Sequence, residues 1–224
     1  MKVLVIDDTK VHLTAALQTL AGHDVIVCST HNDAAQLVRP QYDEAKKKAL
    51  IEKYRAEGMD GNEVYDRAYK ESRLPYWDAV LCDLLMPAGS MAQGGEGLRH
   101  VGEEMPVGWS LALQAAKNGA KFVAVVTDTN HHHHPASAML DGLNGHLFSI
   151  DGAKMLLTNY VSFVGITGTE CACEECGGSG KKSRNDGSQY ECVYCKGSGQ
   201  GFSQKGKDWG KILSQVLGIK EEED

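Results

Sequence analysis

Short apolar runs that alternate with helical patterns constrain the fold of this 224-residue chain more than any other feature. Residues 2–6 are apolar and rich in β-branched side chains, and they stop at Asp7 and Asp8. A run of this length is typical of a buried strand. Similar runs occur at residues 24–29, 77–83 and 121–127. Helical patterns separate the runs, so the sequence predicts an α/β fold with a doubly wound, mostly parallel five-stranded sheet.

The other segments complete this organisation. The fifth strand is predicted at residues 146–150, and residues 160–166 form a further strand-like run. We expect an α/β domain over residues 1–167, with a helical hairpin inserted at about residues 41–74. A cysteine-rich module is expected at 168–207. Residues 208–224 are expected to contain a helix that packs back on the α/β domain, through Trp209, Ile212, Leu213 and Val216.

The composition is that of a soluble globular protein, with 42% hydrophobic and 24% charged residues. A net charge of -7 disfavours nonspecific electrostatic binding to nucleic acid. No apolar run approaches the roughly 20 residues of a membrane helix. The first residues lack the pattern of a secretory signal, so a cytoplasmic location without membrane contact is expected.

Three acids end predicted strands that are neighbours in such a sheet. Asp7 and Asp8 follow the first strand, and Asp83 ends the third. Three carboxylates in one crevice repel one another unless a cation is present. Oxygen ligands favour a hard divalent ion, so Mg²⁺ is predicted at this edge.

These residues resemble a known family. Residues 1–38 and the segment Trp77-Asp-Ala-Val-Leu-Cys-Asp-Leu-Leu-Met-Pro87 look like parts of the receiver domain of response regulators. The resemblance implies a signalling or phosphorelay role, in which Asp83 takes a phosphoryl group. It also implies that Asp7 and Asp8 hold Mg²⁺ together with Asp83, and that Thr127 bonds a phosphoryl oxygen.

The chain departs from this family at the predicted fifth strand. The family places a lysine at the end of that strand, where this sequence offers Ser149, and Lys154 is out of register. His146 stands where the family often has an aromatic switch residue. A pseudo-receiver with poor phosphorylation is therefore expected. His131–His134 follow Thr127 closely and are either a metal- or phosphate-facing cluster or a polar loop.

Two copies of C-x-x-C-x-G-x-G give the strongest local signal. They begin at Cys173 and Cys192. Four thiolates in a tetrahedral array select Zn²⁺, so Cys173, Cys176, Cys192 and Cys195 are predicted to hold one structural zinc ion. Cys171 is close enough in sequence to compete as a ligand. Cys28 and Cys82 lie singly in apolar runs and are expected to be buried.

The two repeats resemble the cysteine-rich zinc region of DnaJ-type co-chaperones. That region has four such repeats, and the His-Pro-Asp motif of a J-domain is absent from this sequence. The resemblance implies a zinc-binding β-hairpin module that contacts a protein or peptide partner. It does not imply stimulation of a partner ATPase.

Three functions fit these residues. The first is a receiver-like signalling protein with a zinc hairpin for protein interaction, which is not an enzyme. The second is a metal-dependent phosphoryl-transfer or hydrolytic enzyme at Asp7, Asp8 and Asp83, with the glycine-rich segment 87–108 as a lid. The third is a structural scaffold with an inactive acidic site.

Overall fold

The predicted strand-forming runs pair into one central sheet. The computed structural model describes residues 1–91, 94–128, 132, 135–184 and 187–219. The sheet has six strands in the order β2-β1-β3-β6-β8-β7. Their bounds are Lys2–Ile6 for β1, Asp24–Cys28 for β2, Ala79–Asp83 for β3, Phe122–Val126 for β6, Leu147–Ile150 for β7 and Ala153–Thr158 for β8. Five strands run parallel and β7 is antiparallel to β8, so the sheet is mostly parallel as predicted.

A strand forms within the predicted residues 146–150, but its predicted role as the fifth strand of the parallel sheet is wrong. The fifth parallel strand is β8, whereas residues 147–150 form the antiparallel edge strand β7. The cause is the two-residue connection Asp151-Gly152, in which both residues have positive φ angles of 47° and 83°. This conformation makes a tight hairpin whose twist matches that of the flanking strands. The chain therefore folds back, and the sheet has six strands instead of five.

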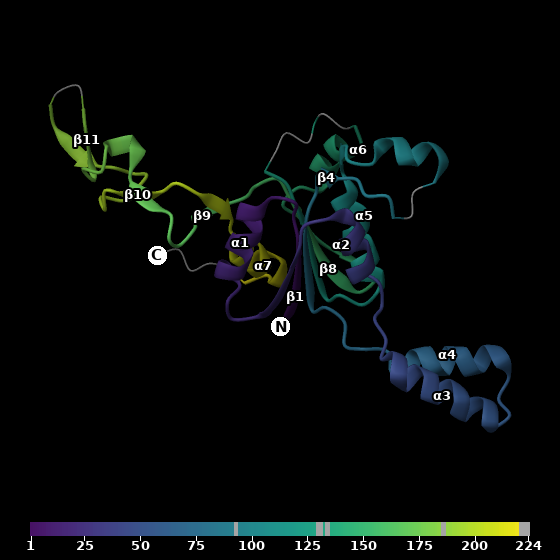
Figure 1. Ribbon diagram of the computed structural model, residues 1–224. Helices are drawn as coiled ribbons and strands as arrows, with labels where there is room; N and C mark the ends of the chain where they lie inside the picture. The colour runs from purple at the N-terminus through teal and green to yellow at the C-terminus, as the bar shows by residue number, and fades with distance from the viewer. Residues whose placement is uncertain (92–93, 129–131, 133–134, 185–186, 220–224) are drawn as a thin grey trace.

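Helices cover both faces of the sheet (Figure 1). On one face, α2 (His31–Leu37) and α5 (Val107–Lys117) contribute alanine and leucine side chains to a core with alternate strand residues. On the other face lie α1 (Lys10–Thr19) and α7 (Trp209–Leu217). Trp209, Ile212, Leu213 and Val216 are buried against this face, as expected.

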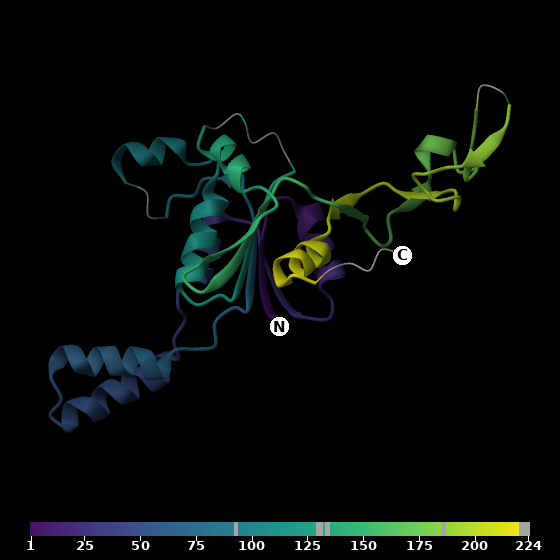
Figure 2. The same ribbon diagram turned by 180° about the vertical axis from the view of Figure 1, so that it is seen from behind.

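The charged segment after β2 forms the predicted helical hairpin. Its helices are α3 (Glu44–Ala56) and α4 (Gly61–Ser72). Each begins at an aspartate, Asp43 or Asp60, whose side chain accepts a hydrogen bond from a backbone N–H of the first turn. Tyr54 is buried between the helices. The hairpin projects away from the sheet, as Figure 2 shows.

The cysteine-rich segment projects from the opposite end of the molecule (Figures 1 and 2). We call residues 163–207 the cysteine arm. Its base is the antiparallel pair β9 (Phe163–Gly165) and β14 (Lys205–Lys207), and α7 begins directly afterwards. Its outer part consists of β10 (Glu170–Ala172), η4 (Glu174–Cys176), β11 (Lys181–Ser183), β12 (Gln189–Glu191) and β13 (Gln200–Phe202). In this part β10 pairs with β13, and β11 pairs with β12.

Shorter elements connect the strands above the C-terminal edge of the sheet. The glycine-rich segment contains β4 (Met86–Pro87), η1 (Gly95–His100) and β5 (Glu104–Met105), and β4 pairs with β5. The segment before β7 contains α6 (Pro135–Ala138) and η3 (Met139–Leu143). Within the described residues, no helix has the length and apolar character needed to cross a membrane.

Candidate functional site

The three acids predicted from the strand ends lie together. β1 and β3 are adjacent parallel strands, so their C-terminal ends bring Asp7, Asp8 and Asp83 to the same edge. One carboxylate oxygen of each lies within 4.8 Å of those of the other two. Asp7 and Asp83 are buried, whereas Asp8 is exposed at the rim. The backbone N–H of Thr9 donates to Asp7 Oδ1 at 2.8 Å and holds that side chain in place.

A lysine that the sequence analysis did not identify lies between these acids. Lys207 Nζ is 2.8 Å from Asp7 Oδ2, 3.0 Å from Asp83 Oδ1 and 3.0 Å from Asp128 Oδ1. Its side chain is completely buried. The expectation that the crevice lacks a lysine is therefore wrong. Lys207 comes from β14, at the end of the cysteine arm, and not from the sheet.

The residues considered for this role lie elsewhere. Lys154 pairs with Phe122, and Phe122 pairs with Ala79, so Lys154 is at the opposite end of the sheet from Asp83. Ser149 is the register partner of Lys154 on β7 and lies at the same opposite end. His146 is exposed. No local signal marks Lys207, because its position depends on where the arm returns to the α/β domain.

A histidine and a fourth acid complete the cluster. His12, on α1, is buried, and its Nε2 lies 3.2 Å from Asp128 Oδ2. Its Nδ1 accepts a hydrogen bond from the backbone N–H of Lys207 at 3.3 Å. Asp128 follows Thr127 directly after β6, at the same edge of the sheet as Asp83. Neither His12 nor Asp128 was predicted from the sequence to be a site residue.

Burial and neighbouring charges raise the pKa values of Asp83 and Lys207 and lower that of Asp128. Burial raises the pKa of Asp83 to about 7, with Lys207 opposing the rise and Asp7 adding to it. Burial alone would raise the pKa of Asp128, but the hydrogen bond from His12 and the charge of Lys207 outweigh it and hold that pKa well below its usual value. Burial alone would lower the pKa of Lys207, but Asp83, Asp7 and Asp128 raise it above its ordinary value. Lys207 is therefore a permanent cation.

One carboxylate oxygen of Asp83 can accept a further bond. Asp83 Oδ1 is buried and, apart from the 3.0 Å ion pair with Lys207 Nζ, has no hydrogen-bond partner among the described residues. A carboxylate oxygen has two lone pairs, so a buried one whose single partner is Lys207 can accept a further cation or donor. With one lysine among four acids, the cluster retains negative charge. Both features suit a divalent cation with oxygen ligands.

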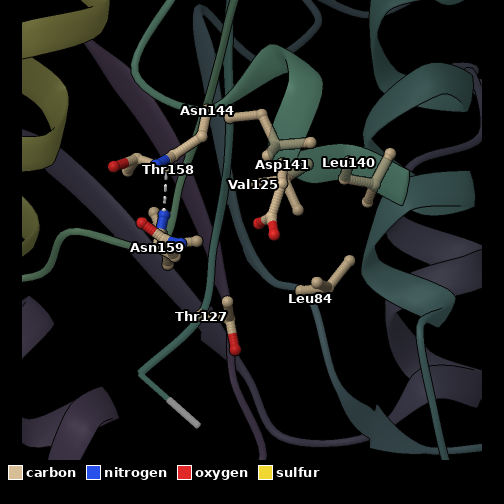
Figure 3. A pocket seen from close by; sticks show the side chains of 10 residues that line it. Leu84, Val125, Thr127, Leu140, Asp141, Asn144, Thr158 and Asn159 are labelled. Atoms are coloured by element: carbon tan, nitrogen blue, oxygen red, sulfur yellow. Dashed lines mark hydrogen bonds between the residues drawn. The ribbon is translucent and has the colours of Figure 1, made fainter. Parts of the chain in front are cut away.

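Thr127 lies beside Asp83, one residue beyond Val126, which is the register partner of Asp83. Its side chain is buried, and its backbone N–H donates to Thr158 O at 3.2 Å. Figure 3 shows Thr127 at one end of a small pocket. Leu84, Val125 and Leu140 also line this pocket. The pocket lies between the ends of β6 and β8, under η3.

Gly108 supports the loop that follows Asp83. Its backbone N–H donates to Leu84 O at 3.1 Å. A Cβ atom added to Gly108 would lie 1.7 Å from Asp83 O. The start of α5 can therefore approach the phosphoacceptor candidate only with glycine at this position.

The four predicted cysteine ligands lie in one cluster. Cys173 Sγ is 3.9 Å from Cys192 Sγ, and Cys176 Sγ is 3.8 Å from Cys195 Sγ. A zinc ion held tetrahedrally at about 2.3 Å from each thiolate requires sulfurs about 3.8 Å apart. The separations exceed the roughly 2.05 Å of a disulfide, and all four cysteines are free. The cluster could therefore hold a zinc ion. Cys171, on β10, is outside it.

The two cysteine repeats support each other. The backbone N–H of Cys173 donates to Gly199 O, and that of Cys192 donates to Gly180 O, both at 2.8 Å. The Gly180 N–H donates to Cys176 Sγ at 3.2 Å. Burial alone would raise the pKa of Cys176, but this bond and those to the neighbouring thiols lower it to about 7. Cys176 thus favours the thiolate form that binds metal, whereas burial raises the pKa of Cys173 to about 11.

The histidine run is described only in part. His131, His133 and His134 lie outside the described residues. His132 is exposed, and its Nε2 lies 3.5 Å from Asp141 Oδ2.

Comparison of the sequence with protein-family models and with curated proteins finds no match.

Proposed function

We propose that this protein is a receiver-like regulatory protein in which the Asp83 carboxylate accepts a phosphoryl group. The observation that carries the proposal is the contact of buried Lys207 with Asp83, at 3.0 Å. The parallel order of β2, β1, β3, β6 and β8, with helices on both faces, supports a doubly wound receiver architecture. In such sheets, ligands bind at the C-terminal edge of the strands, where Asp83 lies.

The proposed chemistry needs few groups. An oxygen of Asp83 attacks the phosphorus of a donor, such as an acyl phosphate, as the bond to the leaving oxygen breaks. The product is an acyl phosphate on Asp83, and the donor leaves as a carboxylate. Lys207 and the Thr127 hydroxyl would donate to phosphoryl oxygens. Asp7, Asp8 and Asp83 would hold Mg²⁺, whose charge offsets that of the phosphoryl group.

Lys207 changes the expected outcome. A site without a lysine lacks one charge-assisted hydrogen bond to the phosphoryl group, which costs about 1.5–3 kcal/mol. Poor phosphorylation is expected of such a site. Lys207, at the end of the cysteine arm, would donate that bond, so we propose a working phosphoacceptor site instead of a pseudo-receiver.

The cysteine arm is proposed to carry one structural zinc ion and to contact a protein partner. The sulfur separations of 3.8 and 3.9 Å support the zinc ion. Val193 and Tyr194, between the last two cysteines, are 69% and 68% exposed. Exposed apolar side chains on a projecting module suit contact with another protein.

The experiment is intact-mass measurement after treatment of the full chain with acetyl phosphate and Mg²⁺. We expect near-stoichiometric addition of one phosphoryl group, absent in Asp83→Asn and reduced at least tenfold in rate in Lys207→Met. Rapid release of inorganic phosphate without accumulation would favour the hydrolytic enzyme. No addition to the parent protein would overturn the proposal and leave the scaffold.

A further inference from the structure

His12 contacts both the backbone and the charged network of Lys207. Its Nδ1 accepts from the Lys207 backbone N–H at 3.3 Å, and its Nε2 lies 3.2 Å from Asp128 Oδ2. Asp128 Oδ1 in turn lies 3.0 Å from Lys207 Nζ. Because Nδ1 is the acceptor, the neutral ring carries its proton on Nε2 and donates it to Asp128. The three residues therefore form a closed ring of polar contacts.

The strand that carries Lys207 has little other support. β14 is not part of the central sheet and pairs only with β9 among the described strands. It rests on α1, where a Cβ atom added to Gly206 would lie 2.6 Å from Val11 O and 2.5 Å from the Ala15 Cβ. The position of Lys207 is therefore set by the contact of β14 with α1, of which His12 is the polar part.

Trp209, the second residue after this strand, contacts the same helix. The Trp209 Nε1–H donates to His12 O at 3.0 Å, and Trp209 is completely buried. α1 thus contacts the chain on both sides of Asp208, at Lys207 and at Trp209. Since α1 also follows Asp8 in the chain, it joins the acids to the arm.

We infer that His12 is a positioning residue that seats Lys207 against Asp83 and makes the base of the cysteine arm part of the acid site. The part of this inference that concerns phosphorylation rests on the function proposed above. A phosphoryl group on Asp83 that takes over the bonds of Lys207 Nζ changes the contacts of the last residue of β14. Because Lys207 is the last residue of the cysteine arm, the arm is the segment through which a partner regulates the site or detects its phosphorylation.

The test measures whether Lys207 leaves the crevice. The zinc-loaded full chain is treated with N-hydroxysuccinimide acetate, and acetylation of each lysine is followed by peptide mass spectrometry. Lys117, which is exposed, is the internal reference. In the parent protein Lys207 reacts only through opening of the site. In His12→Ala we expect the rate at Lys207, relative to Lys117, to rise at least tenfold.

Further substitutions of His12 distinguish a role in positioning Lys207 from a role in filling space. His12→Leu fills the site without polar groups and should expose Lys207 as His12→Ala does. His12→Asn retains an acceptor near Nδ1, and His12→Gln retains a donor near Nε2, so each should restore part of the protection. Equal protection in folded His12→Leu and in the parent would overturn the inference.

Two further variants control for loss of structure. His31 is equally buried and accepts the Gly89 backbone N–H through Nδ1 at 3.2 Å, so His31→Ala removes a matched contact and should leave Lys207 protected. Gly206→Ala pushes β14 away from α1 without removing a polar group, and it should expose Lys207 even if His12→Ala fails to fold. Gly22→Ala, with open space around the added Cβ, is its control. Exposure of Lys207 in His31→Ala to the same degree as in His12→Ala would overturn the inference.

The same proteins are treated with acetyl phosphate and Mg²⁺. Failure of the parent to accept a phosphoryl group overturns the proposed function, and acetylation of Lys207 still decides the role of His12. Phosphorylation of His12→Leu at the parental rate, despite an exposed Lys207, would overturn the link between the arm and Asp83. We expect a rate at least tenfold lower.

Discussion

Lys207 Nζ donates a hydrogen bond to Asp7 Oδ2 at 2.8 Å, and both side chains are completely buried. Asp83 and Asp128 share the same ammonium group. Burial of charges costs several kcal/mol for each ion, so a cluster of this kind persists only while its partners remain in place.

Lys207→Met should lower the free energy of unfolding by about 3–5 kcal/mol in Mg²⁺-free buffer, because it leaves buried carboxylates without a cation. Denaturant titration of the zinc-loaded protein measures this change. Lys121→Met is the control, since Lys121 is 70% exposed although it lies 2.8 Å from Asp78. It should cost less than about 1 kcal/mol. Equal effects of the two substitutions would contradict the prediction.

Asp83→Asn should stabilise the protein at pH 8 without Mg²⁺. The folded-state pKa of Asp83 is raised to about 7 by burial, so its contribution to stability is present at low pH and is lost as the pH rises through that value. The variant should match the parent near pH 4 and exceed it by about 1–4 kcal/mol at pH 8. Denaturant titrations across this range measure the difference. A constant difference at all pH values would argue against the raised pKa.

Asp128→Asn should have the opposite effect at pH 8. The pKa of Asp128 is lowered in the folded protein, so its carboxylate stabilises the fold above the ordinary aspartate pKa of about 4, and this stability is lost as the pH falls. We expect the variant to be less stable than the parent by about 1–3 kcal/mol at pH 8, the value of a hydrogen bond to a charged group. The gap between the two proteins should narrow below pH 4. Thermal melts at pH 3 and pH 8 provide the comparison, and a gap that widens in acid would contradict it.

Mg²⁺ should raise the melting temperature of the parent protein. An ion that binds only the folded state adds about 2.7 kcal/mol at 100 times its dissociation constant. Asp83→Asn should lose most of this effect, whereas Asp78→Asn, which changes an acid outside the crevice, should retain it. The measurement is calorimetry over a Mg²⁺ series. Undiminished Mg²⁺ stabilisation of Asp83→Asn would show that the acids do not form a joint site.

The purified chain should contain close to one equivalent of zinc by elemental analysis. Cys176→Ser removes one of the four clustered sulfurs and should release the ion, whereas Cys171→Ser should retain it because Cys171 lies outside the cluster. The arm has a core of little besides its cysteines, so loss of zinc should also increase amide exchange in residues 170–202. Full zinc content in Cys176→Ser would exclude the predicted ligand set.

The features that could be predicted from the sequence are those encoded by nearby residues. Apolar runs at residues 2–6 and 77–83 place Asp7, Asp8 and Asp83 at one edge, because strand ends follow directly from local patterns. The spacing of Cys173, Cys176, Cys192 and Cys195 is likewise a local signal. A strand at residues 146–150 was predicted, but its antiparallel pairing with β8 was not, although Asp151-Gly152 marks the hairpin between them.

The lysine of the acid site could not be predicted in this way. Lys207 and Asp7 are 200 residues apart in the sequence, and a short strand containing two glycine-flanking lysines carries no sign of burial. Its position depends on the close approach of Gly206 to α1 and on the two contacts of His12. These are packing relationships between elements that are distant in the chain. Only the tertiary structure therefore determines which cation neutralises the carboxylates, because the ion pair requires the end of the cysteine arm to pack against α1.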